Sequence, residues 1–245
     1  MLQEAPWHRN ELIGFDLETT GIDRFNDVPV SFALVTMVGG AVVCRESALV
    51  DPGRPIPEEA TAVHGITDDR VRAEGIPLDV AMGMVADALG DAWVRGVPVV
   101  GMKLDYDLTI VDVQCRSLND RGLADRGFST PVLDILVLDR HLDCYRKGSR
   151  SLSELCAHYG VVIDNAHDAA ADAAASLEVL AAMAARYDEL SAMTPPELHR
   201  AQMEWHREWA TSYDGWRRGE GMSALDPRDY AWPFAEGEEA AAGAA

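Results

Sequence analysis

The side chains in this sequence best suited to chemistry are carboxylates at the ends of expected buried strands. Residues 11–16 predict a short strand, and Asp16 and Glu18 stand two positions apart at its C-terminal end. Alternate residues of a strand point to the same face, so these two carboxylates converge while Phe15 and Leu17 point the other way. Adjacent anions raise each other's pKa unless a cation lies between them. Because solvated carboxylates are also common at strand ends, the pair indicates a cation site only together with further residues.

A second candidate ligand follows a later strand. Residues 97–101 predict a short buried strand and residues 107–118 a helix, with Tyr106 and Asp107 at the junction. An aspartate at a helix N-terminus is also favoured by the helix dipole, and Asp105 could equally be a cap.

The third candidate lies on the helix that the sequence predicts most clearly, over 168–187, which is rich in alanine. His167 and Asp172 are five residues apart, about 1.4 turns, so their side chains lie on neighbouring faces. The surrounding alanines leave room for close approach to a sheet. Taken alone, this pair is explained equally well by an exposed histidine and a solvated aspartate.

Taken together and in this order, these residues resemble the DEDD (DnaQ-like) superfamily of 3′→5′ exonucleases, in its histidine-containing (DEDDh) subclass. Residues 15–21, Phe-Asp-Leu-Glu-Thr-Thr-Gly, are a near-ideal form of the first motif of that family. Tyr106-Asp107 matches the end of the second motif, and His167 with Asp172 matches the third, H-x-x-x-x-D. The segment 63–67 is similar to an accessory segment of the proofreading, epsilon-subunit-like branch.

One pair of residues departs from the family pattern. Members commonly carry His-Asn before the second motif, where this chain has Met102 and Lys103. Neither position supplies one of the four carboxylates, so no ligand is lost. The change alters the local substrate contacts, offers Lys103 to a phosphate and leaves Asp105 as the alternative to Asp107.

The resemblance implies two divalent cations, Mg²⁺ or Mn²⁺, which prefer hard oxygen ligands. The family's ligands correspond here to Asp16, Glu18, Asp107 and Asp172, with Asp16 bridging both ions. Such a pair can stabilise the entering and leaving oxygens of a phosphoryl displacement. His167 is then the expected general base toward the attacking water, and 5′-mononucleotides leave from a 3′-OH end.

The resemblance also implies substrate contacts. Leu17, Thr19 and Thr20 are expected to meet the terminal nucleotide through backbone and hydroxyl groups. His64 is expected to line the base pocket, although a histidine that only packs or caps a helix explains it equally well.

The charge balance restricts the partners. The chain has 245 residues, with 21 basic and 41 acidic side chains and a net charge of −20. Bulk electrostatics therefore oppose nucleic-acid binding, which depends on Lys and Arg displacing counterions. Divalent ions at clustered carboxylates would reverse this locally. The expected partner is a single-stranded or frayed 3′ end of DNA, with RNA as the alternative, bound with low processivity.

The elements that must position these residues form a meander followed by alternating helices and short strands. Strands over 11–16, 30–38 and 41–45 have tight connections, which predicts three antiparallel strands. Later strands and helices are expected at 78–92, 97–101, 107–118, 132–134, 135–141, 151–159 and 168–187. This order predicts an α/β fold, a mixed sheet flanked by helices. The resemblance implies a ribonuclease H-like arrangement in which shorter parallel strands follow the three antiparallel ones.

Composition divides the chain into three parts. Residues 8–190 form the expected exonuclease domain, since the resemblance covers about 10–190. Residues 191–235 form a Trp-rich helical C-terminal extension, and the low-complexity residues 236–245 are expected to be disordered. An apolar stripe at helical spacing in the extension, Leu198, Ala201, Trp205 and Trp209, favours packing against the core. A stacking platform for bases or a docking surface for a partner protein is the alternative.

The sequence predicts a cytoplasmic protein without membrane association, since we find neither a signal peptide nor a spanning segment. The four cysteines are expected to be reduced and buried. The function best supported at this stage is metal-dependent 3′→5′ hydrolysis of DNA, of a proofreading or repair type. The alternatives are an exoribonuclease of the RNase T or oligoribonuclease type and a catalytically silent nucleic-acid-binding module.

Overall fold

A computed structural model describes residues 6–119, 121–127, 131–164 and 166–235. The tail that the sequence predicts to be disordered, 236–245, lies outside the described residues.

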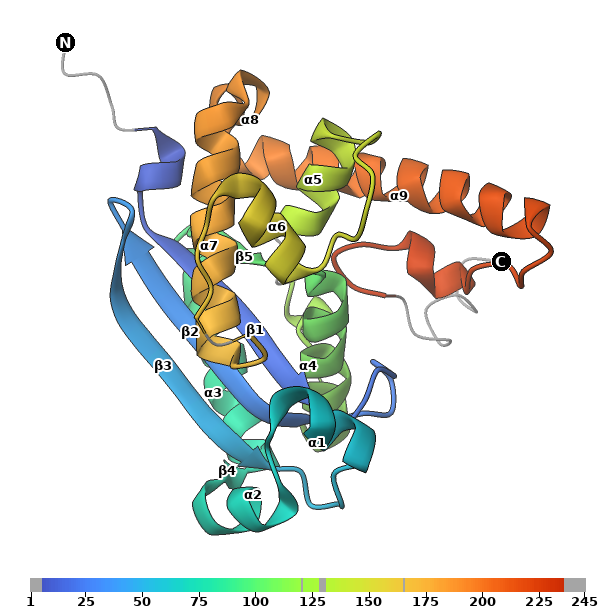
Figure 1. Cartoon of the computed structure of the whole chain (residues 1–245). Helices are drawn as coiled ribbons and strands as arrows, with labels where there is room; N and C mark the ends of the chain where they lie inside the picture. Colours follow the sequence, from blue (N-terminus) through green and yellow to red (C-terminus); the bar gives the residue numbers. More distant parts are fainter. Residues whose placement is uncertain (1–5, 120, 128–130, 165, 236–245) are drawn as a thin grey trace.

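A six-stranded mixed sheet runs through the centre of the structure (Figure 1). Its strands follow the order β4-β3-β2-β1-β5-β6. The pairs β1–β2 and β2–β3 are antiparallel, whereas β5 and β6 continue the sheet in parallel from β1. The expected fold class, three antiparallel strands followed by shorter parallel ones, is confirmed. The strands span β1 Leu12–Thr19, β2 Pro29–Val38, β3 Ala41–Asp51, β4 Ile76–Pro77, β5 Val99–Gly101 and β6 Val132–Asp134.

Helices cover both faces of this sheet. In Figure 1, α7 lies across one face and α3 and α4 lie behind the other. The α-helices span α1 Glu58–His64, α2 Asp68–Glu74, α3 Leu78–Val94, α4 Leu104–Asn119, α5 Ile135–Leu142, α6 Leu152–Tyr159, α7 Ala169–Arg186, α8 Asp188–Ala192 and α9 Pro195–Gly219. Three short 3₁₀ turns lie at η1 Trp7–Arg9, η2 Ala124–Arg126 and η3 Pro227–Tyr230.

Strand β1 is buried on both faces because its side chains alternate between two cores. Phe15 and Leu17 pack on the side of α3 and α4, and Leu12 packs on the side of α7. Gly14 allows α7 to cross β1 closely, since a Cβ there would lie 2.5 Å from the carbonyl oxygen of Ala173. The small residues of both elements therefore bring the start of α7 against the C-terminal half of β1.

Side-chain caps fix the starts of the helices that flank the sheet. Asp168 accepts hydrogen bonds from the first backbone amides of α7, so the helix predicted over 168–187 is observed at 169–186. Helix α4 begins at Leu104, three residues before the predicted start. Asp134 causes this difference, because its carboxylate accepts hydrogen bonds from Lys103 N at 3.0 Å and from Leu104 N at 2.9 Å.

Helix α9 covers the open edge of the sheet at β6. The fully buried Gln202 side chain donates to the Val132 carbonyl at 3.1 Å and accepts from Asp134 N at 2.8 Å. The amide thus pairs with β6 as a neighbouring strand would and protects an edge that could otherwise pair with another chain. The ring of His199 accepts a further hydrogen bond from Val132 N at 3.3 Å.

The rest of the extension folds back onto the same core. Trp232 is buried among the core residues on the α3 and α4 side, and Ala235 N donates to Thr109 Oγ1 at 2.9 Å. The buried face of α9 differs from the predicted apolar stripe. Its inner residues include the polar Gln202, which is hydrogen-bonded to β6, and His206, whose Nε2 is hydrogen-bonded to the Asp229 carbonyl of η3. Trp209 lies at the side of this face, partly exposed.

The structure also shows the state of the cysteines and the character of the helices. All four cysteines are free thiols, but only Cys115 and Cys156 are buried. The expectation of burial was wrong for Cys44 and Cys144, which are exposed. No helix in the described ranges is long and apolar enough to cross a bilayer.

Replacing Gln202 with leucine tests the edge cap. Leucine has a similar volume but leaves Asp134 N and the Val132 carbonyl without partners. Because each unpaired buried group costs about 1–3 kcal/mol, we expect the free energy of unfolding to fall by about 2–4 kcal/mol in urea denaturation. Exposed Arg207 on the same helix is the control, and Arg207→Ala should change this free energy by less than about 0.5 kcal/mol. Equal stability of both variants would contradict the cap.

Candidate functional site

Carboxylates from three elements converge at the C-terminal end of β1. Asp16 and Glu18 extend from the β1 face that α7 crosses, and Asp172 lies in the first turn of α7. The charges of four nearby carboxylates, Asp107, Asp172, Glu18 and Asp168, all raise the pKa of Asp16. The structure therefore brings together the four carboxylates that the sequence predicts as ligands and adds Asp168 beside them.

The turn before α7 places the predicted histidine next to this cluster. His167 has a left-handed backbone, with φ of 68°, and its N–H donates to Asp172 Oδ2 at 3.3 Å. One potential ligand atom from each of Glu18, His167 and Asp172 lies within 4.8 Å of the others. The side chain of His167 is exposed to solvent, so it can reach both the cluster and a bound molecule.

The structure separates the roles of Asp105 and Asp107. Both lie in the first turn of α4 and both are buried. Asp105 forms a salt bridge with Arg24 at 2.8 Å, whereas Asp107 lies close enough to Asp16 for its charge to raise the pKa of Asp16. Asp107 is therefore the better candidate ligand, and Asp105 has a partner of its own.

Without a countercharge, these carboxylates disfavour their own ionisation. Burial raises the pKa of Asp16 well above its ordinary value, and the nearby Asp107, Asp172 and Glu18 raise it further. Burial and the charge of Asp172 raise the pKa of Glu18 to about 8. The pKa of Asp172 rises to about 6, mainly through burial, although the hydrogen bond from His167 N opposes the rise.

The donor set fits a hard divalent cation. Carboxylate oxygens are the ligands that Mg²⁺ and Mn²⁺ prefer. Oδ1 of Asp172 is buried and has no hydrogen-bond partner among the described residues. Buried polar atoms are rarely left unpaired, so an orphaned carboxylate oxygen beside other carboxylates is a position that a cation would satisfy.

The four predicted substrate-contact residues, Leu17, Thr19, Thr20 and His64, line one pocket of about 620 Å³. The hydroxyl of Thr20, however, donates to Asp27 at 2.7 Å and accepts from Val28 N at 3.2 Å. The hydroxyl of Thr19 donates to the Gly21 carbonyl at 2.7 Å. Both hydroxyls are therefore engaged within the protein.

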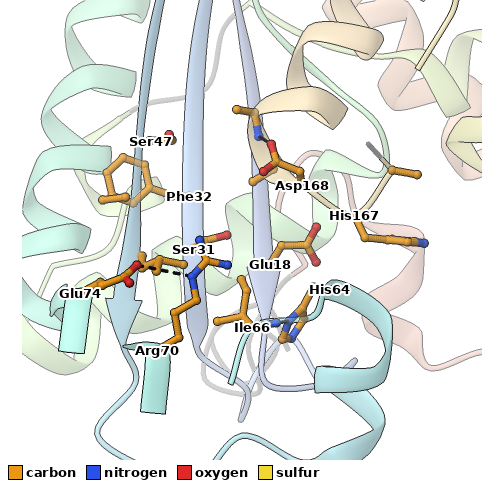
Figure 2. A pocket seen from close by; sticks show the side chains of 15 residues that line it. Glu18, Ser31, Phe32, Ser47, His64, Ile66, Arg70, Glu74, His167 and Asp168 are labelled. Carbon is orange, nitrogen blue, oxygen red and sulfur yellow. Dashed lines mark hydrogen bonds and ion pairs between the residues drawn. The ribbon is translucent and has the colours of Figure 1, made fainter. Parts of the chain in front are cut away.

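His64 stands between this pocket and a second one of about 490 Å³, and it lines both. Figure 2 shows it beside Glu18 and His167 at one end of the second pocket, with Arg70 and Glu74 at the other. Helix α1 ends at His64 because Gly65 adopts the left-handed conformation. The His64 Nδ1 atom accepts from Ile66 N at 3.0 Å, which leaves the proton of the neutral ring on Nε2. Burial lowers the pKa of His64, so the neutral form is favoured.

Two residues of the site were not predicted. Tyr106 was recognised only as a motif position, yet its ring lines the first pocket and its hydroxyl donates to the Gly21 carbonyl. Asp168 was treated only as part of a helix. An aspartate just before an alanine-rich helix is, however, typical of an N-cap, and this pattern could have predicted its position.

Lys103 adopts a left-handed backbone conformation, with φ of 61°. Asparagine, which is usual at this position in the family, adopts this conformation more readily.

Comparisons with known proteins identify the family of the chain. A family model for RNase_T, described as "Exonuclease", matches residues 13–180. The chain is 32% identical over 184 residues to a DNA polymerase III PolC-type protein of Lacticaseibacillus paracasei, covering 75% of the chain and 12% of that protein. It is 32% identical over 188 residues to a DNA polymerase III subunit epsilon-like protein of Rhodobacter capsulatus, covering 72% of the chain and 24% of that protein.

The fold is shared with solved structures. E. coli Exonuclease I in complex with a 5cy-dT13 oligonucleotide is similar, with a TM-score of 0.65 and 18% identity over 81% of this chain and 44% of that one. The fold and the convergent carboxylates define a DnaQ-like exonuclease with a ribonuclease H-like sheet. Since the family model spans well over half of the sequence, the chain belongs to the RNase_T exonuclease family.

Asp16→Asn tests the electrostatic strain of the cluster without measuring activity. Asparagine removes the charge at the centre of the repulsion, so we expect the melting temperature in EDTA to rise by several degrees. Each kcal/mol gained in the free energy of unfolding corresponds to a rise of about 2–4 °C. Mg²⁺ or Mn²⁺ should raise the melting temperature of the unmodified chain but not that of the variant.

The 98% exposed Asp69 supplies the control, since Asp69→Asn removes one surface charge whose exposed salt bridge with Arg72 contributes little to stability. This control should melt as the unmodified chain does, with and without metal. A lower melting temperature for Asp16→Asn in EDTA would contradict the strain.

Proposed function

We propose that this chain is a metal-dependent 3′→5′ exonuclease that hydrolyses DNA to 5′-mononucleotides. The observation that carries the proposal is the convergence of Asp16, Glu18, Asp107 and Asp172 at one strand end, with His167 at its edge. A function that needs no cation does not explain why these carboxylates are held together against their mutual repulsion. A silent binding module would have no need of them.

The residues that would hold two divalent cations, Mg²⁺ or Mn²⁺, are Asp16, Glu18, Asp107 and Asp172. When bound, such ions neutralise the cluster and stabilise the charge that develops on the phosphate during displacement. The exposed ring of His167 accepts the proton of the attacking water, a role suited to an imidazole near neutral pH. The hydrogen bond from His167 N to Asp172 holds this residue beside the reacting phosphate.

The pocket next to the cluster is the proposed place for the terminal nucleotide. Leu17 and Val63 supply apolar contacts for a base, and the neutral ring of His64 completes one wall. Because the hydroxyls of Thr19 and Thr20 are engaged within the protein, their contribution would come through backbone groups and shape.

DNA is the proposed substrate because relatives of the chain are described as parts of DNA polymerase III, and a similar fold has been solved with a DNA oligonucleotide. The chain spans only 12% of the PolC-type relative, so any place in a polymerase assembly is likewise a proposal. A partner protein would meet the C-terminal extension. On the sequence argument given above, we also propose a cytoplasmic location.

His167→Asn tests the proposed base. Asparagine keeps a polar side chain but cannot accept a proton near neutral pH, so kcat should fall by about 10²–10⁴-fold. The measurement is the shortening of a 5′-labelled single-stranded DNA with Mg²⁺, with Mn²⁺ and with EDTA. His158, which lines neither pocket, is the control, and His158→Asn should retain activity within about 2-fold. Undiminished activity of His167→Asn would remove the histidine from the mechanism.

Substrate class and direction are tested with matched oligonucleotides. We expect a 5′-labelled DNA to shorten stepwise from its 3′ end, a DNA with a blocked 3′ end to resist, and RNA of the same sequence to be cleaved at least about 10-fold more slowly. A difference of about 1.4 kcal/mol in the binding of the transition state changes the rate 10-fold. The loss of a single contact to the RNA is therefore enough to give the expected preference for DNA. Faster cleavage of RNA would favour the exoribonuclease alternative.

A further inference from the structure

Helix α9 carries a stacked column of aromatic rings outside the matched family region. The guanidinium of Arg140, from α5, lies 3.5 Å from the centre of the Trp209 ring. The rings of Trp209 and Tyr213 stack with centroids 5.1 Å apart, and those of Tyr213 and Trp216 with centroids 5.5 Å apart, each pair within 18° of parallel. The column ends at Trp216, which is 51% exposed.

This column is connected to the candidate active site. A pocket of about 480 Å³ is lined by Arg140 and Trp209 together with Ile22, Lys103 and Tyr106. The last three residues also line the pocket proposed for the terminal nucleotide. A molecule that leaves that pocket past Lys103 therefore reaches the base of the column directly.

The charge along this path differs from that of the chain as a whole. The connecting pocket is lined by three cations and two carboxylates, Arg24, Lys103, Arg140, Asp105 and Asp229. Arg24 pairs with both of the carboxylates.

Lys103 and Arg140 are the two remaining cations, and neither forms a salt bridge within the described part of the chain. Burial lowers the pKa of Arg140, while the nearby charges of Asp134 and Asp105 act in the opposite direction without forming a salt bridge to it. In a protein with 41 acidic residues and 21 basic ones, two cations that line one path and form no salt bridge suit an anionic ligand.

Resting on the proposed function, we propose that this surface binds the single-stranded DNA that lies 5′ of the nucleotide in the active site. Lys103 and Arg140 contact its phosphates, and an unpaired base stacks on the open ring of Trp216. Cationic grooves beside aromatic platforms are the usual means of holding single strands. Insertion between the rings would need about 7 Å, twice the 3.4 Å stacking distance, so the end of the column is the binding face. The alternative occupant, a partner protein, becomes an outcome of the test.

The primary test measures binding without cleavage. Fluorescence anisotropy of 5′-labelled dT15 and dT4 in EDTA compares the unmodified chain with Trp216→Ala. We expect the Kd for dT15 to rise about 10-fold, since stacking on one aromatic side chain accounts for a factor of this order. The Kd for dT4, which is confined to the strand-end site, should change by less than about 2-fold.

Arg207→Ala is the matched control, because Arg207 lies two residues from Trp209 and therefore on the opposite face of α9. It should bind both oligonucleotides as the unmodified chain does. Arg140→Gln provides a readout that a merely structural role would not change. It should reduce the slope of log Kd against log salt for dT15 by about 0.7, the value for one phosphate contact on a single strand.

The outcomes separate this proposal from the proposed function. If Trp216→Ala and the unmodified chain bind dT15 equally, the surface does not hold DNA and a protein partner becomes the better occupant, even where hydrolysis proceeds as proposed. If the unmodified chain hydrolyses no DNA but Trp216→Ala weakens dT15 binding, the surface stands and the proposed reaction fails. Tighter binding of U15 than of dT15 would overturn the assignment to DNA.

Discussion

The repulsion between Asp16 and the carboxylates around it is the force that the rest of the fold must oppose. Burial and four neighbouring acids all disfavour the ionised form of this side chain. The opposing contribution comes from apolar packing on both faces of β1 and from the close crossing of α7 over Gly14. The close packing of α7 against Gly14 keeps Asp172 beside Asp16. Preorganisation of this kind lowers the cost of binding a metal and a phosphate.

The negative net charge of the chain determines how nucleic acid can approach the site. A net charge of −20 repels a polyanion over most of the surface, so attraction must be local. The cations that line the pocket beside the cluster include Lys103, which replaces an uncharged residue of the family pattern and lies over the ring of Tyr106. A strand guided by a few fixed cations, and not by a broad basic face, is held at its end. That arrangement suits removal of terminal nucleotides better than binding along duplex.

The sequence correctly predicted those features of the fold that depend on interactions between residues close together in the chain. Alternation along β1 and the alanine-rich stretch of α7 placed Asp16, Glu18 and Asp172 correctly on their elements. The start of α4 was mispredicted because Asp134, about 30 residues later, caps it, and no local pattern encodes that contact. The engagement of the Thr20 hydroxyl by Asp27 was missed for a related reason, since it depends on how the chain returns after β1. The start of α4 and the pairing of the Thr20 hydroxyl were therefore decided by tertiary hydrogen bonds and not by the secondary-structure propensities of the local sequence.

A series of hydrogen bonds links the extension to the candidate site. Gln202 of α9 binds Asp134 N, the Asp134 carboxylate binds the backbone of Lys103 and Leu104, and α4 begins there with Asp107 in its first turn. A chain ended near residue 190 would expose the edge of β6 and remove the support of this cap, although the family model ends at residue 180. Loss of Gln202 should therefore disturb Asp107 through α4 before it disturbs Asp16 or Glu18, which β2 holds along the full length of β1. The ligand contributed by α4 is thus the one whose position depends on the extension.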